Sequence, residues 1–178
     1  MFDAFLERVN EMLEVLLVDE NNRGLGRMEK LEAHEKACLH RAFSVFLIHE
    51  GKMLIQKRAL SKYHCPGIWT NICCSHPLEG EVIPYALQRL KEEVGIEQVE
   101  LEEVGTMIYK AEFDNGLTEY EYDHLLLGKY DGDVLINPEE VAEVRWLEFA
   151  ELKEEIEKNP QLFTPWFKLA LDQVLEKI

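Results

Sequence analysis

Long hydrophobic runs are missing from this 178-residue chain, and none reaches the length that a membrane-spanning helix needs. The N-terminus also lacks the basic segment followed by an apolar one that marks a secretory signal. Cysteine is scarce, and four residues in a chain of this length do not make a disulfide framework. We therefore expect a cytoplasmic protein with reduced thiols and no membrane partner.

Basic residues are in short supply, because 19 Lys and Arg stand against 35 Asp and Glu and the net charge is -16. A nucleic-acid partner would need a basic face, so this balance argues against that class of function. It does not exclude an anionic small molecule as partner, because a pocket can be locally basic on an acidic protein.

Internal repeats, low-complexity tracts and Pro/Gly/Ser-rich linkers are also absent, while 47% of the residues are hydrophobic. That content fills one core well in a chain of this length. We expect a single domain over residues 1–178, as a monomer or weak dimer.

Hydrophobic periodicity predicts a mixture of strands and helices. The strands are expected at residues 14–18, 42–49, 52–57, 67–77, 102–113, 118–130 and 143–149, and the helices at residues 1–12, 82–94, 151–158 and 165–177. Gly95 suits a left-handed cap at the end of the second helix. Because strands and helices do not alternate strictly, we expect an α+β protein, an α/β/α sandwich on a mixed sheet.

The expected strand at residues 67–77 contains Cys73, Cys74 and His76. Side chains two apart on a strand share a face, so Cys74 and His76 can face one pocket while Cys73 faces the other way. A lone cysteine is more often a small buried apolar residue. A nearby cation would lower the pKa of Cys74 and make the thiol a usable acid or base.

Carboxylates recur two apart on another expected strand, and two histidines lie upstream of the cysteines. The candidate metal ligands are His34, His40, His76, Glu119 and Glu121. A mixed nitrogen and oxygen set suits Mn²⁺, Mg²⁺ or Zn²⁺. The alternative is surface histidines beside a solvated acidic strand, although paired like charges on one face are costly without a cation.

Four cations are scattered along the sequence, each beside another motif: Lys30, Arg58, Lys62 and Arg89. Arg58 and Lys62 follow a strand, where a loop can present both to a phosphate. The alternative is ordinary solubilising charge.

Residues 90–96 match the second half of the Nudix box, G-x5-E-x7-R-E-U-x-E-E-x-G-U, in which helix glutamates hold a divalent ion on a diphosphate. The first Gly, first Glu, Arg and next Glu of that box are replaced by Cys74, Gly80, Gln88 and Arg89. A short E-E-x-G is weak by itself. The broken box is consistent with a diphosphate-binding scaffold that has lost the hydrolytic metal cluster.

Together these residues resemble the type I isopentenyl-diphosphate isomerases, a family of Nudix-fold enzymes, from about Met28 to the C-terminus. The resemblance rests on the segments M-E-K-L-E-A-H at 28–34, L-H-R-A-F-S at 39–44, K-R-A at 57–59, P-G-I-W-T-N at 66–71, C-S-H-P at 74–77, E-Y-E at 119–121 and P-W at 165–166. Residues 1–12 lie outside the resemblance.

The resemblance implies a role for each matching residue. It implies that the five His and Glu residues hold a metal such as Mn²⁺ or Zn²⁺, and that Glu93 holds an Mg²⁺ on the substrate diphosphate. Lys30, Arg58, Lys62 and Arg89 resemble the diphosphate clamp. Cys74 and Glu121 resemble the proton-transfer pair, with Tyr109 beside Glu121 and Trp166 as the aromatic wall over the hydrocarbon. Before the resemblance is considered, Trp166 is more simply a core anchor of the last helix.

The implied reaction is isomerisation of isopentenyl diphosphate to dimethylallyl diphosphate. One alternative is a Nudix pyrophosphohydrolase acting on a diphosphate, which would need the intact box. Another is a non-catalytic module that binds a metal or a phosphorylated ligand, which would not need Cys74 opposite Glu121.

Overall fold

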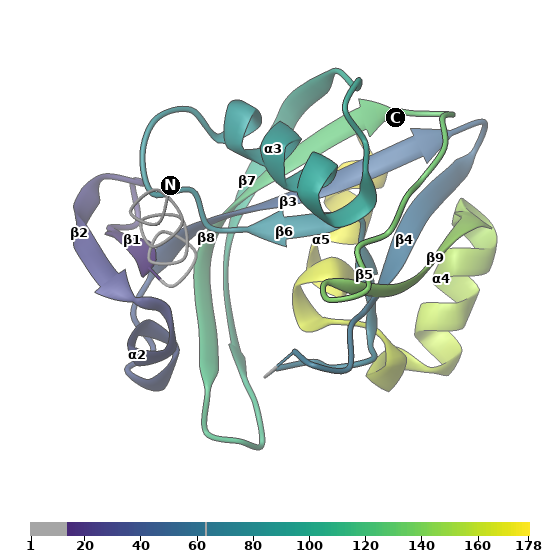
Figure 1. Ribbon diagram of the computed structural model, residues 1–178. Coiled ribbons are helices and arrows are strands. Elements are labelled where there is room, and N and C mark those ends of the chain that lie inside the picture. Colours follow the sequence, from purple (N-terminus) through teal and green to yellow (C-terminus); the bar gives the residue numbers. More distant parts are fainter. Residues whose placement is uncertain (1–13, 63) are drawn as a thin grey trace.

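The computed structural model describes residues 14–62 and 64–178. The helix expected at residues 1–12 lies outside them. The described strands form one mixed sheet (Figure 1). They are β1 (Glu14–Val18), β2 (Gly24–Glu29), β3 (His40–His49), β4 (Lys52–Arg58), β5 (Trp69–Asn71), β6 (Cys73–Ser75), β7 (Leu101–Glu112), β8 (Thr118–Lys129) and β9 (Val141–Glu148).

Parallel pairing occurs between β3 and β8, and the other paired strands are antiparallel. Both faces of the sheet are covered, because apolar side chains of β3 are buried on both of its faces. Phe46 and Ile48 belong to one buried cluster, whereas Phe43, Val45 and Leu47 belong to another. A strand buried on both faces needs a layer on each side.

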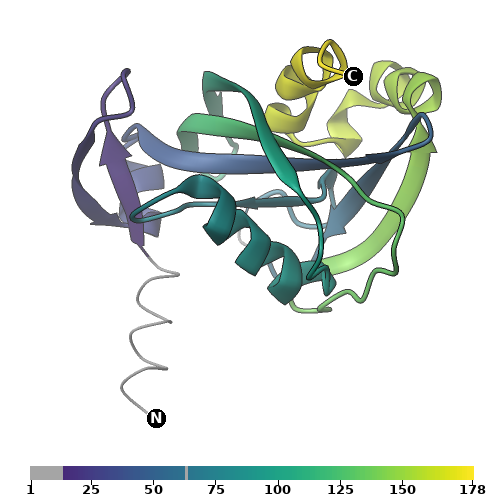
Figure 2. The same ribbon diagram turned by 90° about the horizontal axis from the view of Figure 1, so that it is seen from above.

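Helices supply these two layers, and Figure 2 shows α3 (Val82–Val94) on one face and α4 (Phe149–Lys158) with α5 (Pro165–Leu175) on the other. Leu90 and Val94 of α3 pack into one cluster, and Phe167 and Ala170 of α5 pack into the other. The expected α/β/α sandwich is therefore confirmed. None of the helices in residues 14–62 and 64–178 has the length and apolar composition of a membrane span.

Two helix ends follow the sequence rules that predicted them. Gly95 caps α3 with φ 68°, a left-handed conformation in which glycine carries no side-chain penalty. Pro165 occupies the first turn of α5, where its missing N–H costs nothing. This fixes the point from which Trp166 projects.

The single strand expected at residues 67–77 is wrong, because the chain bends at Ile72 and makes two short strands. The first, β5, pairs with β4, and the second, β6, pairs with β3. Strand β2 and the short helix α2 (Lys30–Glu35) were not predicted from the sequence. Strand β2 has mostly exposed residues and two glycines, and α2 is too short to show a helical period.

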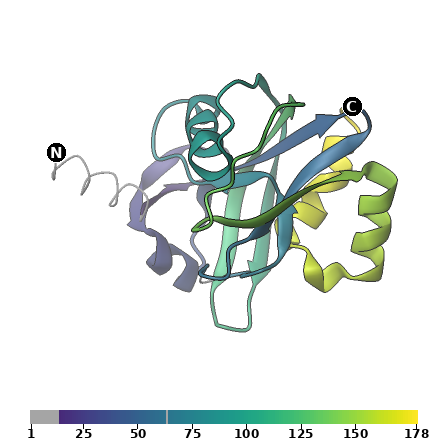
Figure 3. The ribbon, with the colours of Figure 1, turned by 45° about the vertical axis from the view of Figure 1, so that its right-hand side comes forward.

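At one end of the sheet, segments far apart in sequence meet. Figure 3 shows β1, β2 and α2, in purple, at the end of the molecule remote from α4. There His40, the first residue of β3, stands in register with Glu121 of β8. Helix α2 packs against β8. These elements carry the candidate site.

Candidate active site

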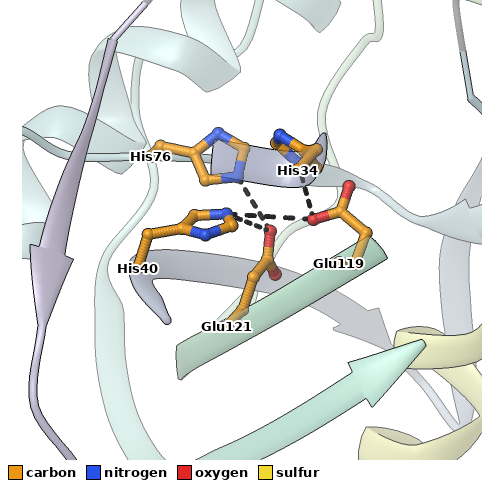
Figure 4. Close-up of side chains that lie close together, drawn as sticks. All are labelled: His34, His40, His76, Glu119 and Glu121. Carbon is orange, nitrogen blue, oxygen red and sulfur yellow. Dashed lines mark hydrogen bonds and ion pairs between the residues drawn. The ribbon is translucent and has the colours of Figure 1, made fainter. Parts of the chain in front are cut away.

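Five side chains converge at this end of the sheet, and they are the five candidate metal ligands of the sequence analysis. Figure 4 shows them facing one another. One nitrogen or oxygen atom from each lies within 4.8 Å of the corresponding atoms of the others, in the set His34, His40, His76, Glu119 and Glu121. Four of the five are buried and His76 is half-buried. They come from α2, from β3, from the loop after β6 and from β8.

Backbone carbonyls fix the orientation of two of the imidazoles. Nδ1 of His34 bonds the Lys30 carbonyl, and Nδ1 of His40 bonds the Cys38 carbonyl at 2.8 Å. A carbonyl oxygen only accepts, so Nδ1 carries the hydrogen and Nε2 of each ring presents its lone pair to the cluster. Nε2 of His40 is buried and has no hydrogen-bond partner among the described residues.

Carboxylate oxygens meet these nitrogens at close range. Nε2 of His34 lies 3.0 Å from Oε2 of Glu119, and Nε2 of His76 lies 2.8 Å from Oε1 of Glu121. Where the nitrogen is unprotonated, two lone pairs face each other, and a cation between them removes the repulsion. The donor set therefore fits a divalent ion of the Zn²⁺ or Mn²⁺ kind.

Both carboxyl groups are charged at neutral pH. Burial and the neighbouring Glu121 raise the pKa of Glu119, but the contacts with His34 and His64 outweigh both and bring the pKa to about 2. Burial likewise raises the pKa of Glu121, and interactions with His40 and Tyr109 bring it to about 2. Two buried negative charges side by side call for a cation.

The second oxygen of each carboxylate is held by a different donor. The Tyr109 hydroxyl donates to Oε2 of Glu121 at 2.6 Å. The resemblance had implied that Tyr109 lies beside Glu121. His64 lies 2.7 Å from Oε1 of Glu119 through its Nε2. His64 was not predicted as a site residue, because a histidine in a loop carries no periodic signal.

Cys74 and Cys73 face opposite sides of β6, as strand alternation predicted. Cys73 is fully buried in the cluster under α3, whereas Cys74 lines a cavity with His76 and Glu121. The Cys74 thiol donates to Oδ1 of Asn71 at 3.2 Å. We expected cations to lower the pKa of Cys74, but in the protein alone burial raises it to about 12, so the thiol is protonated at neutral pH.

Behind Cys74 lies a polar group that the sequence analysis missed. Oγ of Ser44 lies 3.6 Å from the Cys74 sulfur and donates to Oδ2 of Asp123 at 2.7 Å. Burial raises the pKa of Asp123 well above its usual range. These residues come from β3 and β8, and β3 pairs with both β6 and β8, so the sheet brings all three side chains together.

The four candidate diphosphate cations line the same cavity as Cys74, whose volume is about 120 Å³. Arg58 donates to the backbone carbonyls of His64 and Cys65, each at 3.2 Å, and its guanidinium lies 5.6 Å from the centre of the Trp166 ring. Burial lowers the pKa of the half-buried Lys30 ammonium group. The convergence of scattered cations on one cavity favours an anion site over solubilising charge.

Carboxylates accompany two of these cations. Arg89 pairs with Glu92 and Glu93, each at 2.7 Å, and Lys62 pairs with Glu140, which the sequence analysis missed. Burial raises the pKa of Glu93. Glu93 lines the cavity but is not one of the five clustered ligands, so any metal that it holds is a separate one.

Trp166 lines the same cavity and also belongs to the hydrophobic cluster beneath α5. Its side chain is only 4% exposed. The ring centre lies 6.1 Å from that of His64 and 6.5 Å from that of Tyr109. The position of Trp166 therefore fits both an aromatic wall of the cavity and a core anchor of α5.

Comparison with known proteins defines the class. The sequence pattern of the NUDIX domain matches residues 39–167. The fold is similar to the crystal structure of a MutT NUDIX hydrolase from Burkholderia pseudomallei, with a TM-score of 0.58 at 20% identity, over 76% of this chain and 98% of that one. It is also similar to DR0079 from Deinococcus radiodurans, with a TM-score of 0.65 at 18% identity, over 82% and 89% of the two chains. This is a Nudix-domain protein.

Relatives of higher sequence identity define the family within the Nudix-domain proteins. An isopentenyl-diphosphate Delta-isomerase of Photobacterium profundum is 44% identical over 93% of this chain and 96% of its own length. A protein of the same name from Aliivibrio fischeri is 45% identical over 90% and 94% of the two chains. The chain belongs to the isopentenyl-diphosphate Delta-isomerase family.

Proposed function

We propose that this protein isomerises isopentenyl diphosphate to dimethylallyl diphosphate. The observation that carries the proposal is that Cys74 and Glu121, from different strands, line one cavity whose other lining includes four cations. The names of relatives at 44 and 45% identity support the same activity.

The reaction needs one proton donor and one acceptor around a bound alkene. A proton is added to the terminal carbon of the double bond, which leaves a tertiary carbocation. A proton is then lost from the neighbouring methylene, and its C–H electron pair forms the new double bond, so one proton enters and one leaves. Cys74 and Glu121 supply these two groups in the proposal, and Tyr109 orients the Glu121 carboxyl.

The metal residues of the proposal are the five clustered side chains, for Mn²⁺ or Zn²⁺, and Glu93 for Mg²⁺ beside the diphosphate. A bound divalent ion at the first site supplies positive charge that stabilises the buried carboxylates and acidifies groups bound to it. The protein side chains orient the two carboxyl groups and keep the imidazole lone pairs directed inward.

Three further proposals concern the domain extent, the oligomeric state and the location of the protein, and they rest on its sequence composition and length and not on the site. We propose that residues 1–178 form one isomerase domain, that the protein is a monomer or weak dimer, and that it works in the cytoplasm. Size-exclusion chromatography with light scattering tests the oligomeric state.

The direct test mixes purified protein, Mg²⁺ and isopentenyl diphosphate and follows the products by NMR. We expect dimethylallyl diphosphate without release of phosphate. Phosphate release would instead support the pyrophosphohydrolase, which the broken Nudix box disfavours. Binding of the diphosphate with neither product would support a non-catalytic module.

Turnover is expected to depend on a metal bound at the five-residue cluster. Protein purified without chelator should contain a transition metal or Mg²⁺, and dialysis against a strong chelator should abolish turnover, because buried Glu119 and Glu121 then lose their cation. Elemental analysis and a turnover assay before and after adding back Mn²⁺, Zn²⁺ or Mg²⁺ provide the measurement. Full activity in metal-free protein would contradict the prediction.

Arg58→Lys tests the anion site. Lysine keeps the charge but loses the planar fork of donors, so the Michaelis constant for the diphosphate should rise about tenfold while turnover changes less. The matched control is Arg145→Lys, since Arg145 also stacks on a tryptophan, 4.1 Å from the Trp69 ring, but does not line the cavity. An unchanged Michaelis constant in Arg58→Lys and in Lys62→Ala would favour solubilising charge.

Trp166 substitutions separate the aromatic wall from the core anchor. If the ring faces the carbocation, Trp166→Phe should keep part of the turnover and Trp166→Leu much less, since a cation over an aromatic face gains ~1–2 kcal/mol when water is excluded. Trp69→Leu serves as the packing control, because Trp69 is buried outside the cavity lining. Turnover and melting temperature are measured together, and normal turnover in folded Trp166→Leu would end the catalytic interpretation.

A further inference from the structure

The two clustered carboxylates are bound in the same way. In Glu121, Oε1 faces His76 at 2.8 Å, and Oε2 accepts a hydrogen bond from Tyr109 at 2.6 Å. In Glu119, Oε2 faces His34 at 3.0 Å, and Oε1 lies 2.7 Å from Nε2 of His64. Each carboxylate thus turns one oxygen to the imidazoles and the other to a donor outside the five-residue cluster.

His64 is packed in the position from which it reaches Glu119. Its side chain is only 7% exposed, and its ring centre lies 6.1 Å from that of Trp166 and 5.9 Å from that of Phe113. Its backbone carbonyl accepts a hydrogen bond from Arg58 at 3.2 Å. A side chain fixed by ring packing and by its own backbone can orient a partner at little entropic cost.

We infer that His64 is a positioning residue of the metal centre, which sets the orientation of Glu119 by donating from Nε2 to its outer oxygen. This inference depends on the proposed function in one respect, which is that the five-residue cluster holds a metal. Because a carboxylate only accepts hydrogen bonds, the imidazole must be the donor at 2.7 Å. With Oε1 held, the carboxylate cannot rotate about its terminal torsion, and Oε2 stays directed at the imidazoles.

His64 is not proposed as a sixth ligand. The atoms that lie within 4.8 Å of one another belong to the other five residues, and Nε2 of His64 is already committed to Glu119. Partners of this outer kind commonly change metal affinity by about 10- to 100-fold when they are removed. The expected effect is therefore on metal affinity, with Glu119 and the other ligands still in place.

Two substitutions of similar size separate the donor from the ring packing. His64→Leu fills the apolar wall but cannot donate, whereas His64→Gln keeps an N–H donor. We expect His64→Leu to weaken Zn²⁺ binding by about 10- to 100-fold and His64→Gln to weaken it by much less. Affinity is measured with Zn²⁺ alone, by competition with a chromophoric chelator, and needs no turnover assay.

His124 provides a matched control. It is also 7% exposed and bonds a carboxylate, with Nδ1 lying 3.0 Å from Oε2 of Glu103, but it lies outside the cluster. His124→Leu should leave Zn²⁺ affinity within about twofold of the unmodified protein. Melting of each variant in chelator reports packing separately from metal binding.

The outcomes decide the inference. Zn²⁺ affinity that falls in His64→Leu and is largely retained in His64→Gln and His124→Leu supports it. Unchanged affinity in His64→Leu overturns it, and so does an equal loss in His64→Gln and His64→Leu. Should His64→Leu fail to fold, retention of affinity in His64→Gln supports the inference and a loss of about tenfold or more overturns it. The Zn²⁺ affinities can be interpreted in the same way even if the isomerase assay fails, because they are measured without turnover.

Discussion

Cys74→Ala is expected to reduce isomerisation by roughly 10²- to 10⁴-fold, the range that a positioned proton-transfer group contributes. The thiol lines the same cavity as Glu121, and burial raises its pKa to about 12, so it holds a proton at neutral pH and can serve as the donor of the proposed reaction. Alanine removes that proton and adds no new group. Steady-state turnover of isopentenyl diphosphate at saturating Mg²⁺ gives the measurement.

The neighbouring cysteine supplies the control for that prediction. Cys73 is fully buried under α3 and does not line the cavity, so Cys73→Ala should lower the melting temperature and leave turnover of the folded protein near normal. If both variants are folded and lose turnover equally, Cys74 has no special role. Circular dichroism on both proteins establishes the comparison.

Strand alternation explains why much of the candidate site could be predicted from sequence. Glu119 and Glu121 share a face of β8, and Cys74 turns to the opposite side of β6 from Cys73. These relations depend only on the two-residue period of a strand, which survives an error of one or two residues in its bounds. The predicted helix over residues 82–94 and its glycine cap likewise needed only local signals.

The rest of the site depends on tertiary contacts that local patterns do not encode. His64 reaches Glu119 across 55 positions of sequence, and Ser44 reaches Asp123 across 79. Glu140 meets Lys62 across 78 positions. His64, Ser44, Asp123 and Glu140 were not predicted from the sequence as site residues, because each meets its partner from a distant part of the chain and only the folding of the sheet reveals the contact.

The break at Ile72 has the same kind of origin. The segment reads as one strand, but β5 pairs with β4 and β6 pairs with β3, so the chain must change partners between them. Asn71 sits at this change and donates to the carbonyls of Val45 and Cys73, at 3.1 and 2.9 Å. Its buried amide replaces ladder hydrogen bonds that a continuous strand would have made.

Glu121→Gln is expected to have an effect at least as large as that of Cys74→Ala. Glutamine has nearly the same shape as glutamate but carries no charge and cannot exchange a proton near neutral pH. The substitution therefore removes one metal ligand and one of the two proposed proton-transfer groups together, so turnover should fall by more than roughly 10²- to 10⁴-fold. Turnover and bound metal are measured on the same preparation.

Glu119→Gln separates the two losses, because Glu119 is the matching carboxylate of the cluster and has no proposed part in proton transfer. Both variants should bind Zn²⁺ or Mn²⁺ more weakly. Excess metal should then restore part of the turnover in Glu119→Gln and none in Glu121→Gln, since added metal replaces occupancy but not a carboxyl that exchanges a proton. Recovery of turnover in Glu121→Gln at high metal would show that this carboxylate serves as a ligand alone, and the second proton-transfer group would have to be another residue of the cavity.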